Sequence, residues 1–224
     1  MSFADIVAFG GAEALETAGC SRITVQIGRD DAKTPNKLQF QGDKAIDWSS
    51  NELKASDIRK SFEKSGLSVK EMGVLVSALG ELRRVVTETI SNSKESDSED
   101  DDVLAGVYSE TDYITQLVFT FTFCFDHCTN LGDQAFEDLV PSTFGSRDKM
   151  YGAKMGKGNF GTTYLKALQK GSSDDNLRAV LTGDPQVLEI VKKAAGSDAN
   201  FQRDVAEAYL KMTLLGEAYS TRNS

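Results

Sequence analysis

The sequence has little cysteine, histidine or proline. Its 224 residues include three cysteines, one histidine and three prolines. Three cysteines are too few for a disulfide-stapled domain, and the odd count leaves at least one thiol free or paired outside the chain. The cysteine count therefore excludes a disulfide scaffold and leaves the redox compartment open.

Positive charge and long apolar runs are also scarce. The chain has 25 basic against 34 acidic residues, a net charge of -9, which disfavours binding to phosphate backbones and anionic lipid. No run approaches the roughly 18 apolar residues of a membrane span, and residues 1–5 contain neither a basic region nor an apolar one. We expect a soluble chain without a targeting segment, and neither nucleic acid nor membrane as a partner.

Hydrophobic residues make up 40% of the chain, enough for one core, so we expect a single domain over residues 1–224. Ser2 and Asp5 have the spacing of a capping box, which predicts a helix from about Phe3 to Thr17. Its inner face is predicted to hold Phe3, Ile6, Val7, Ala14 and Leu15.

Two further helices are predicted around Gly66. The first begins at Ser56 or Asp57 and ends at Gly66, which suits a left-handed C-terminal cap. Ser68 and Glu71 form a second capping box, and the next helix carries an apolar stripe at helical spacing, made of Met72, Leu75, Val76 and Leu79.

The last third of the chain is also predicted to be helical. One helix spans Tyr164 to Leu168, and Asp184 and Pro185 are the cap and first residue of another. Asn200 is predicted to cap the final helix, whose inward residues are Phe201, Val205, Ala208, Met212 and Leu215.

Two stretches interrupt this helical pattern. Residues 91–102 contain no apolar side chain, which predicts a mobile acidic surface loop. Residues 118–125 alternate phenylalanine with small or polar side chains, which predicts a half-buried strand within a β-like insertion at about 113–126. The predicted fold is mainly α with this small β element.

Two motifs could indicate a binding function, but each also has a simpler structural interpretation. Gly156–Thr162 matches GxGxxG, but no strand precedes it and no kinase motif follows, so a loop before a helix is the default. The acidic residues from Asp97 to Asp102 could collect Ca²⁺, yet an EF-hand needs a central glycine that is missing. A solvated acidic loop is the default there, and it could steer the chain towards a basic partner.

Cys124, His127 and Cys128 bring three soft ligands into five residues, including the only histidine of the chain. Structural zinc requires four ligands, and a strand would hold the two cysteines about 13 Å apart, beyond disulfide reach. A helical backbone would let Cys124 and Cys128 form a disulfide. Metal or haem binding through His127, and a thiol redox pair, remain open, with a strand-end histidine as the default. Cys20 is expected to be buried or free.

Several stretches in order resemble plant-type haem peroxidases of the ascorbate peroxidase kind. Residues 2–7 and 28–31 are similar to the helix and Gly-Arg-acidic turn that follow the distal helix. Residues 58–72 resemble the pair of helices that ends in the proximal histidine, and residues 160–165, 181–185, 201–212 and 215–216 resemble the last helices. The resemblance implies the proximal half of the peroxidase fold, and it would place the distal helix before Ser2.

The residues that hold haem in that family are not found at the matching positions. The proximal histidine falls on Leu79, and the carboxylate that accepts its second ring N–H falls on Gly161. Leucine has no lone pair for iron. The ascorbate-binding arginine falls on Glu88, with Arg83 and Arg84 as displaced candidates.

These losses make the chain similar to the haem-less ascorbate-peroxidase-like proteins of the chloroplast thylakoid lumen. This narrower resemblance implies a non-catalytic structural subunit without cofactor or metal, bound to photosystem II or another thylakoid complex. The alternatives are an active haem peroxidase whose iron is bound by His127, and a thiol redox module that uses Cys124 and Cys128.

Overall fold

The protein is mainly α-helical, as the sequence predicts. A computed structural model describes residues 2–29, 48, 51–94, 159–172 and 175–215. Seven helices lie in these residues, and none of these residues belongs to a strand. The helices are α1 (Phe3–Thr17), α2 (Ala55–Lys64), α3 (Val69–Lys94), α7 (Thr163–Lys170), α8 (Leu177–Thr182), α9 (Pro185–Ala194) and α10 (Asp198–Thr213). The predicted β-like insertion at 113–126 lies outside the described residues.

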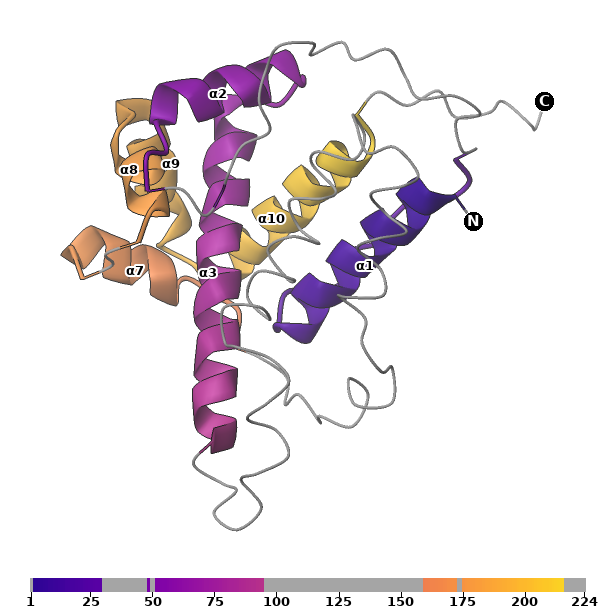
Figure 1. Ribbon diagram of the computed structural model, residues 1–224, viewed down its shortest axis with the longest axis horizontal. Coiled ribbons are helices and arrows are strands. Elements are labelled where there is room, and N and C mark those ends of the chain that lie inside the picture. The colour runs from indigo at the N-terminus through magenta and orange to yellow at the C-terminus, as the bar shows by residue number, and fades with distance from the viewer. Residues whose placement is uncertain (1, 30–47, 49–50, 95–158, 173–174, 216–224) are drawn as a thin grey trace.

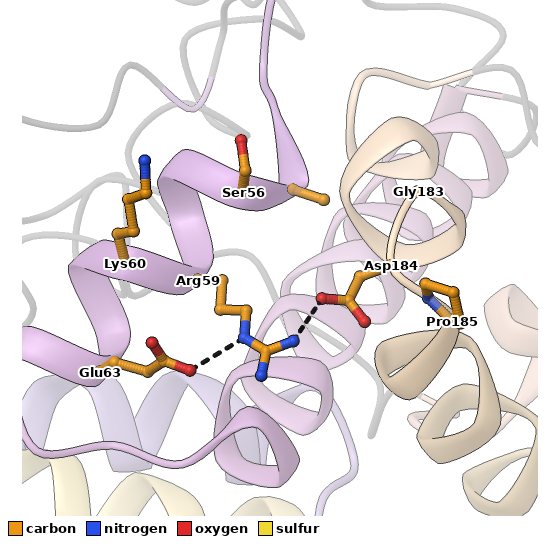
Figure 2. A pocket seen from close by; sticks show the side chains of 8 residues that line it. Ser56, Arg59, Lys60, Glu63, Gly183, Asp184 and Pro185 are labelled. Atoms are coloured by element: carbon orange, nitrogen blue, oxygen red, sulfur yellow. Dashed lines mark hydrogen bonds and ion pairs between the residues drawn. The ribbon is translucent and has the colours of Figure 1, made fainter.

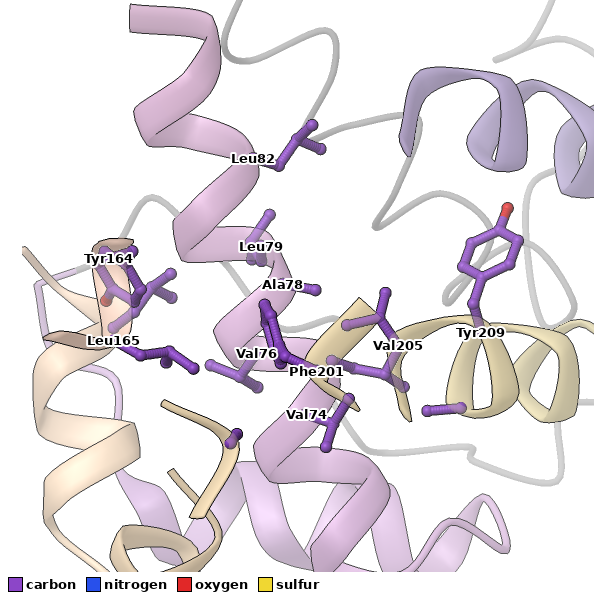
Figure 3. Close-up of a cluster of buried hydrophobic side chains, with 14 of the residues drawn as sticks. Val74, Val76, Ala78, Leu79, Leu82, Tyr164, Leu165, Phe201, Val205 and Tyr209 are labelled. Atoms are coloured by element: carbon purple, nitrogen blue, oxygen red, sulfur yellow. The ribbon is translucent and has the colours of Figure 1, made fainter. Parts of the chain in front are cut away.

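Helix α3 is the central element of the described fold. It runs between α7, α8 and α9 on one side and α10 and α1 on the other, and α2 crosses it near its first turn (Figure 1). The predicted stripe of α3 is confirmed, because Met72, Leu75, Val76 and Leu79 are all buried in one cluster with α7, α9 and α10. Figure 3 shows this cluster, with Tyr164 and Leu165 on one side of α3 and Phe201, Val205 and Tyr209 on the other.

The turn between α2 and α3 follows the predicted pattern. Gly66 has φ +88°, and the Leu67 N–H donates to the carbonyl of Phe62 at 2.9 Å. The capping box is reciprocal: the Glu71 N–H donates to Ser68 Oγ at 3.3 Å, and the Ser68 N–H donates to the Glu71 carboxylate at 2.6 Å. Local residues thus fix where α2 ends and where α3 begins.

The end of α3 differs from the prediction. Residues 91–94 were assigned to the acidic loop, but the helix continues through them to Lys94. This Ser-Asn-Ser-Lys run contains no glycine or proline, and its residues lower helix stability by only a few tenths of a kcal/mol each. Residues 95–102 of that predicted loop lie outside the described residues.

Helix α1 has the predicted bounds, and of its predicted inner face Leu15 is buried and Val7 packs against the core. The Asp5 N–H donates to Ser2 Oγ at 3.1 Å, which confirms the N-cap. Ile6 is 49% exposed, however, and the buried positions are Ala8, Ala12 and Leu15. Helix α1 is joined to α10 by the Tyr209 hydroxyl, which donates to the Ala8 carbonyl at 2.8 Å. The prediction is wrong at Ile6, which lies on the outer side of the helix.

The Gly28–Arg29 turn folds back onto the start of α1. Arg29 Nε donates to Asp5 at 2.7 Å, and its two terminal nitrogens donate to the carbonyls of Ala4 and Thr213. Burial alone would raise the pKa of Asp5, but the Gly28 N–H and the Arg29 guanidinium more than offset this and lower it to about 2. This buried pair joins the two ends of the described chain.

The C-terminal helices are close to the prediction, with one wrong cap and one missed helix. Asp184 caps α9, since its carboxylate accepts the Gln186 N–H at 2.8 Å. The cap of α10 is Ser197 and not Asn200, whose N–H donates to Ser197 Oγ. The six-residue α8 was not predicted. The predicted inward residues Phe201, Val205, Ala208 and Met212 are buried.

In the described ranges, no helix combines the length and the apolar composition that crossing a membrane requires.

Candidate functional site

Leu79 lies in the middle of α3, at the position where the resemblance implies a haem-binding histidine. Its side chain is 2% exposed and belongs to the main hydrophobic core. Its neighbours on α3, Gly80 and Glu81, both contact the segment that contains Gly161. Gly161 is therefore bound to α3 two positions after Leu79, at a contact that we call the α3 junction and that comprises Leu79–Arg84, residues 159–164 and Asp198.

Glu81 is the central charge of the α3 junction, and the sequence analysis did not identify it. Its carboxylate is completely buried. One oxygen accepts the Gly161 N–H at 3.0 Å, and the other accepts the Tyr164 N–H at 2.7 Å. Arg84 donates to the first oxygen at 2.6 Å. Glu81 thus supplies the N-terminal cap of α7, whose own cap residue Thr162 makes no such bond.

The signal for Glu81 was a single charge within an apolar stripe. Val74, Ala78, Glu81 and Val85 follow one another at helical spacing, and all four are buried. A carboxylate in such a row requires hydrogen-bond donors, because burial without them costs several kcal/mol.

Asp198 holds the same segment from the other side. One of its carboxylate oxygens accepts the Thr162 N–H at 3.0 Å and the Thr162 hydroxyl at 2.5 Å. The hydroxyl of Thr162 is the main cause that lowers the pKa of Asp198, so the carboxylate stays ionised near neutral pH. The Phe160 ring stacks on Phe201 with centroids 5.8 Å apart, and Gln202 donates to the Phe160 carbonyl at 2.6 Å.

Tyr164 occupies the face of α3 at Gly80. A Cβ at Gly80 would lie 2.2 Å from a ring carbon of Tyr164, so only glycine fits there without movement. The Tyr164 hydroxyl donates to Asp175 at 3.0 Å. The close approach of α7 to α3 therefore depends on glycine at position 80.

The three candidates for an ascorbate-binding position have structural partners. Glu88 is 58% exposed and forms an ion pair with Arg84 at 2.5 Å. Arg83 donates to the carbonyl of Trp48 and to the Asn176 side chain, each at 2.9 Å, and burial lowers its pKa. Arg84 also donates to the Asn159 carbonyl at 2.8 Å. These contacts assign both arginines to the packing of α3 against neighbouring segments.

A surface groove of about 360 Å³ lies apart from the α3 junction, between α2 and the start of α9 (Figure 2). Its central side chain, Arg59, donates to Glu63 at 2.9 Å and to Asp184 at 2.7 Å. None of the eight residues that line the groove is histidine or cysteine, so it offers no imidazole or thiolate ligand for haem iron. The arrangement joins α2 to α9.

The other predicted candidates give a mixed result. Cys20 is buried, as expected, and burial raises the pKa of its thiol to about 11. Cys124, His127, Cys128, the acidic run Asp97–Asp102 and the glycines at 156 and 158 lie outside the described residues. Where the chain is described, no group of three or more histidine, cysteine or acidic side chains is arranged to hold a metal ion.

The α3 junction does not fit haem in its donor chemistry. An axial bond to iron needs a nitrogen, sulfur or oxygen donor, and Leu79 provides a hydrocarbon. The position that would orient such a ligand, Gly161, has no side chain, and its N–H is already bound to Glu81. The junction connects α3, α7 and α10 through the buried carboxylate of Glu81 and the exposed carboxylate of Asp198.

Comparison with known proteins identifies the family. The family model described as Peroxidase matches residues 1–197, which include α1 to α9 and both Leu79 and Gly161. No curated protein and no solved structure matches the chain. The match spans most of the 224 residues and agrees with the helical fold, so the chain belongs to the peroxidase family.

Proposed function

We propose that this chain is a non-catalytic member of the peroxidase family that binds no haem and serves as a structural or auxiliary subunit of a larger assembly. The observation that carries the proposal is the buried Leu79 on α3, where the resemblance to ascorbate peroxidases calls for the iron-binding histidine. The absence of a carboxylate at Gly161 supports it independently, because ligand and orienting partner are both replaced.

A partner-binding role is supported by apolar side chains on the outside of α1. Ile6 and Phe9 are each 49% exposed and lie three residues apart, so they share one face of the helix. Contiguous exposed apolar surface marks protein interfaces, and we place the partner contact at these two side chains. With a net charge of -9, we expect the partner surface to be apolar with a basic rim.

The cellular setting of the proposal rests on the resemblance to haem-less proteins of the thylakoid lumen. We propose the chloroplast thylakoid lumen as the location and photosystem II or another thylakoid complex as the assembly.

Titration of the full chain with haemin tests the loss of haem. We expect no stoichiometric Soret band and no peroxidase turnover. His127→Ala serves as the matched variant for the competing enzyme hypothesis, which predicts that haem binds to the wild type and is lost in the variant. A saturable Soret band with turnover in the wild type would refute the proposal.

Affinity purification from the native source tests the structural role. Phe9→Glu should abolish recovery of the partner while leaving the melting temperature unchanged, because Phe9 contributes little to the core. Thr24→Glu adds the same charge at another exposed position and should leave recovery intact. If the wild type is purified without any stable partner, the subunit role is wrong.

A further inference from the structure

Gly161 lies between two carboxylates that come from different helices: Glu81 is completely buried, and Asp198 is exposed but held by hydrogen bonds to Thr162. Glu81 on α3 accepts its backbone N–H, and Asp198 on α10 accepts the N–H and hydroxyl of the next residue, Thr162. The backbone at 161 and 162 is thereby fixed to α3 on one side and to α10 on the other.

The geometry points to Glu81 and Asp198 as residues that exclude haem, so that restoring a histidine at 79 and a carboxylate at 161 would not restore a haem site. This inference rests on the proposed loss of haem and deepens it. The missing ligands explain why iron is not held now, whereas the two carboxylates explain why the loss cannot be reversed by the ligands alone.

The position of Asp198 gives the first reason. A Cβ built on Gly161 would lie 3.1 Å from Cγ of Asp198 and 3.2 and 3.3 Å from its two oxygens. A side chain at 161 therefore starts in contact with a carboxylate, and an aspartate would bring a second negative charge against the first. Two carboxylates at such a distance cannot both stay ionised without a cost.

Asp198 is also unable to move away freely. Its oxygen accepts two hydrogen bonds from Thr162, which is only 1% exposed, and its backbone lies in the first turn of α10 directly after the Ser197 cap. Rotation of the carboxylate would leave the buried Thr162 donors without a partner. The charge beside Gly161 is therefore fixed by the surrounding structure.

Glu81 gives the second reason. Its two oxygens hold the N–H groups of Gly161 and Tyr164, so the backbone of this segment is bound directly to α3 two residues after Leu79. In the family arrangement the side chain at 161 must reach the ring at 79. Here the Gly161 backbone is held instead by Glu81, which lies two positions after Leu79 and therefore projects from a different side of α3. A second buried carboxylate at 161 would share with Glu81 the cation Arg84 that contacts it.

A double-mutant cycle tests the contact between positions 161 and 198. Gly161→Asp and Gly161→Asn have nearly the same shape and differ in charge, so each is made in the wild type and in Asp198→Asn. We expect the aspartate variant to melt about 4 °C or more below the asparagine variant in the wild-type background. The difference should become clearly smaller in the Asp198→Asn background, where Glu81 is the one remaining charge beside position 161. Equal melting temperatures of the two variants in the wild-type background would overturn the inference.

Gly161→Asp in Asp198→Ala is a second variant for the case in which crowding prevents folding. It removes both the charge and the atoms that the new side chain meets, so it should fold and melt above Gly161→Asp alone. If it melts no higher, Asp198 is not the obstacle and the inference is wrong.

Titration of each variant with haemin, followed by the Soret band, then measures directly whether haem is excluded. Leu79→His with Gly161→Asp should bind haemin no better than the wild type. Adding Asp198→Ala and Glu81→Gln should lower the apparent Kd at least tenfold. Tight binding by the first pair alone, or none by all four substitutions together, would overturn the inference. Haem binding by the wild type would instead refute the proposed function, and the melting cycle would still report on the carboxylates.

Discussion

Helix α3 is connected to α10 and α7 by two kinds of charged contact, and they differ in burial. Near its start, Lys70 pairs with Asp204 and Glu71 pairs with Lys211 across to α10, with both lysines about half exposed. Further along, the completely buried Glu81 binds two backbone N–H groups and Arg84. Exposed pairs contribute little to stability. Removing a buried carboxylate is strongly destabilising, because its hydrogen-bond donors are left buried without a partner. We therefore expect the α3 junction to contribute more to the free energy of unfolding than the exposed pairs do.

Glu81→Ala should have the largest effect. It leaves two buried N–H groups without an acceptor and Arg84 without its buried partner, so the free energy of unfolding should fall by about 3–5 kcal/mol. Urea unfolding measures this. Glu88→Ala is the matched control, since it removes the exposed carboxylate that pairs with the same arginine and should cost about 1 kcal/mol or less. Equal losses in the two variants would show that the buried contact contributes no more to stability than the exposed one.

Gly80→Ala should rank second. A methyl group at position 80 meets the Tyr164 ring, and overpacking of this kind costs about 1–3 kcal/mol. Gly73→Ala in the same helix gains the same helix propensity but meets only the end of Ile190, at 3.2 Å, so it should cost less. Thermal melts compare the two, and Tyr164→Leu should rescue Gly80→Ala. Absence of rescue would mean that the ring is not what opposes the methyl group.

Acid titration extends the comparison to Asp5, the buried partner of Arg29. Because the pKa of Asp5 falls from 3.8 to about 2 on folding, its ionised form stabilises the fold above pH 3.8, and this contribution is lost as the pH falls towards 2. The stability difference between the wild type and Asp5→Asn should therefore shrink over that interval. Urea unfolding at several pH values measures it, and a difference that is constant between pH 2 and 6 would contradict the assignment.

Lys70→Ala should have the smallest effect. The lysine is 59% exposed, so its pair with Asp204 should contribute about 0.2–1 kcal/mol, and the contribution should decrease further in high salt. Urea unfolding with and without 1 M NaCl checks both points. A loss above about 2 kcal/mol would show that burial does not separate the two kinds of contact.

The helices that could be predicted from the sequence are those with strong local signals. Ser68 with Glu71, and Asp184 with Pro185, each mark a helix start within a few residues, and both were confirmed. Helix α8 escaped prediction because its six residues have no side-chain cap, and Ser197 was missed because Asn200 is an equally good capping residue three positions later.

The haem-binding residues that the candidate site lacks could be predicted from the sequence. The residues that form its contacts instead could not. Leucine at position 79 and glycine at position 161 can be recognised by comparison with a known pattern. The contacts of Glu81 cannot, because its partners lie 80 and 83 residues away and are backbone groups that carry no sequence signature. The same holds for Asp198, whose role depends on how α10 meets Thr162.

The long separation between Glu81 and its partners has a consequence for folding kinetics. When α3 leaves the ribosome, Gly161 and Tyr164 have not yet been translated, so the carboxylate is at first hydrated. It is dehydrated only when residues 161–164 dock against α3, and we expect this docking to follow the rate-limiting step of folding. Substitutions of Glu81 should therefore accelerate unfolding much more than they slow refolding.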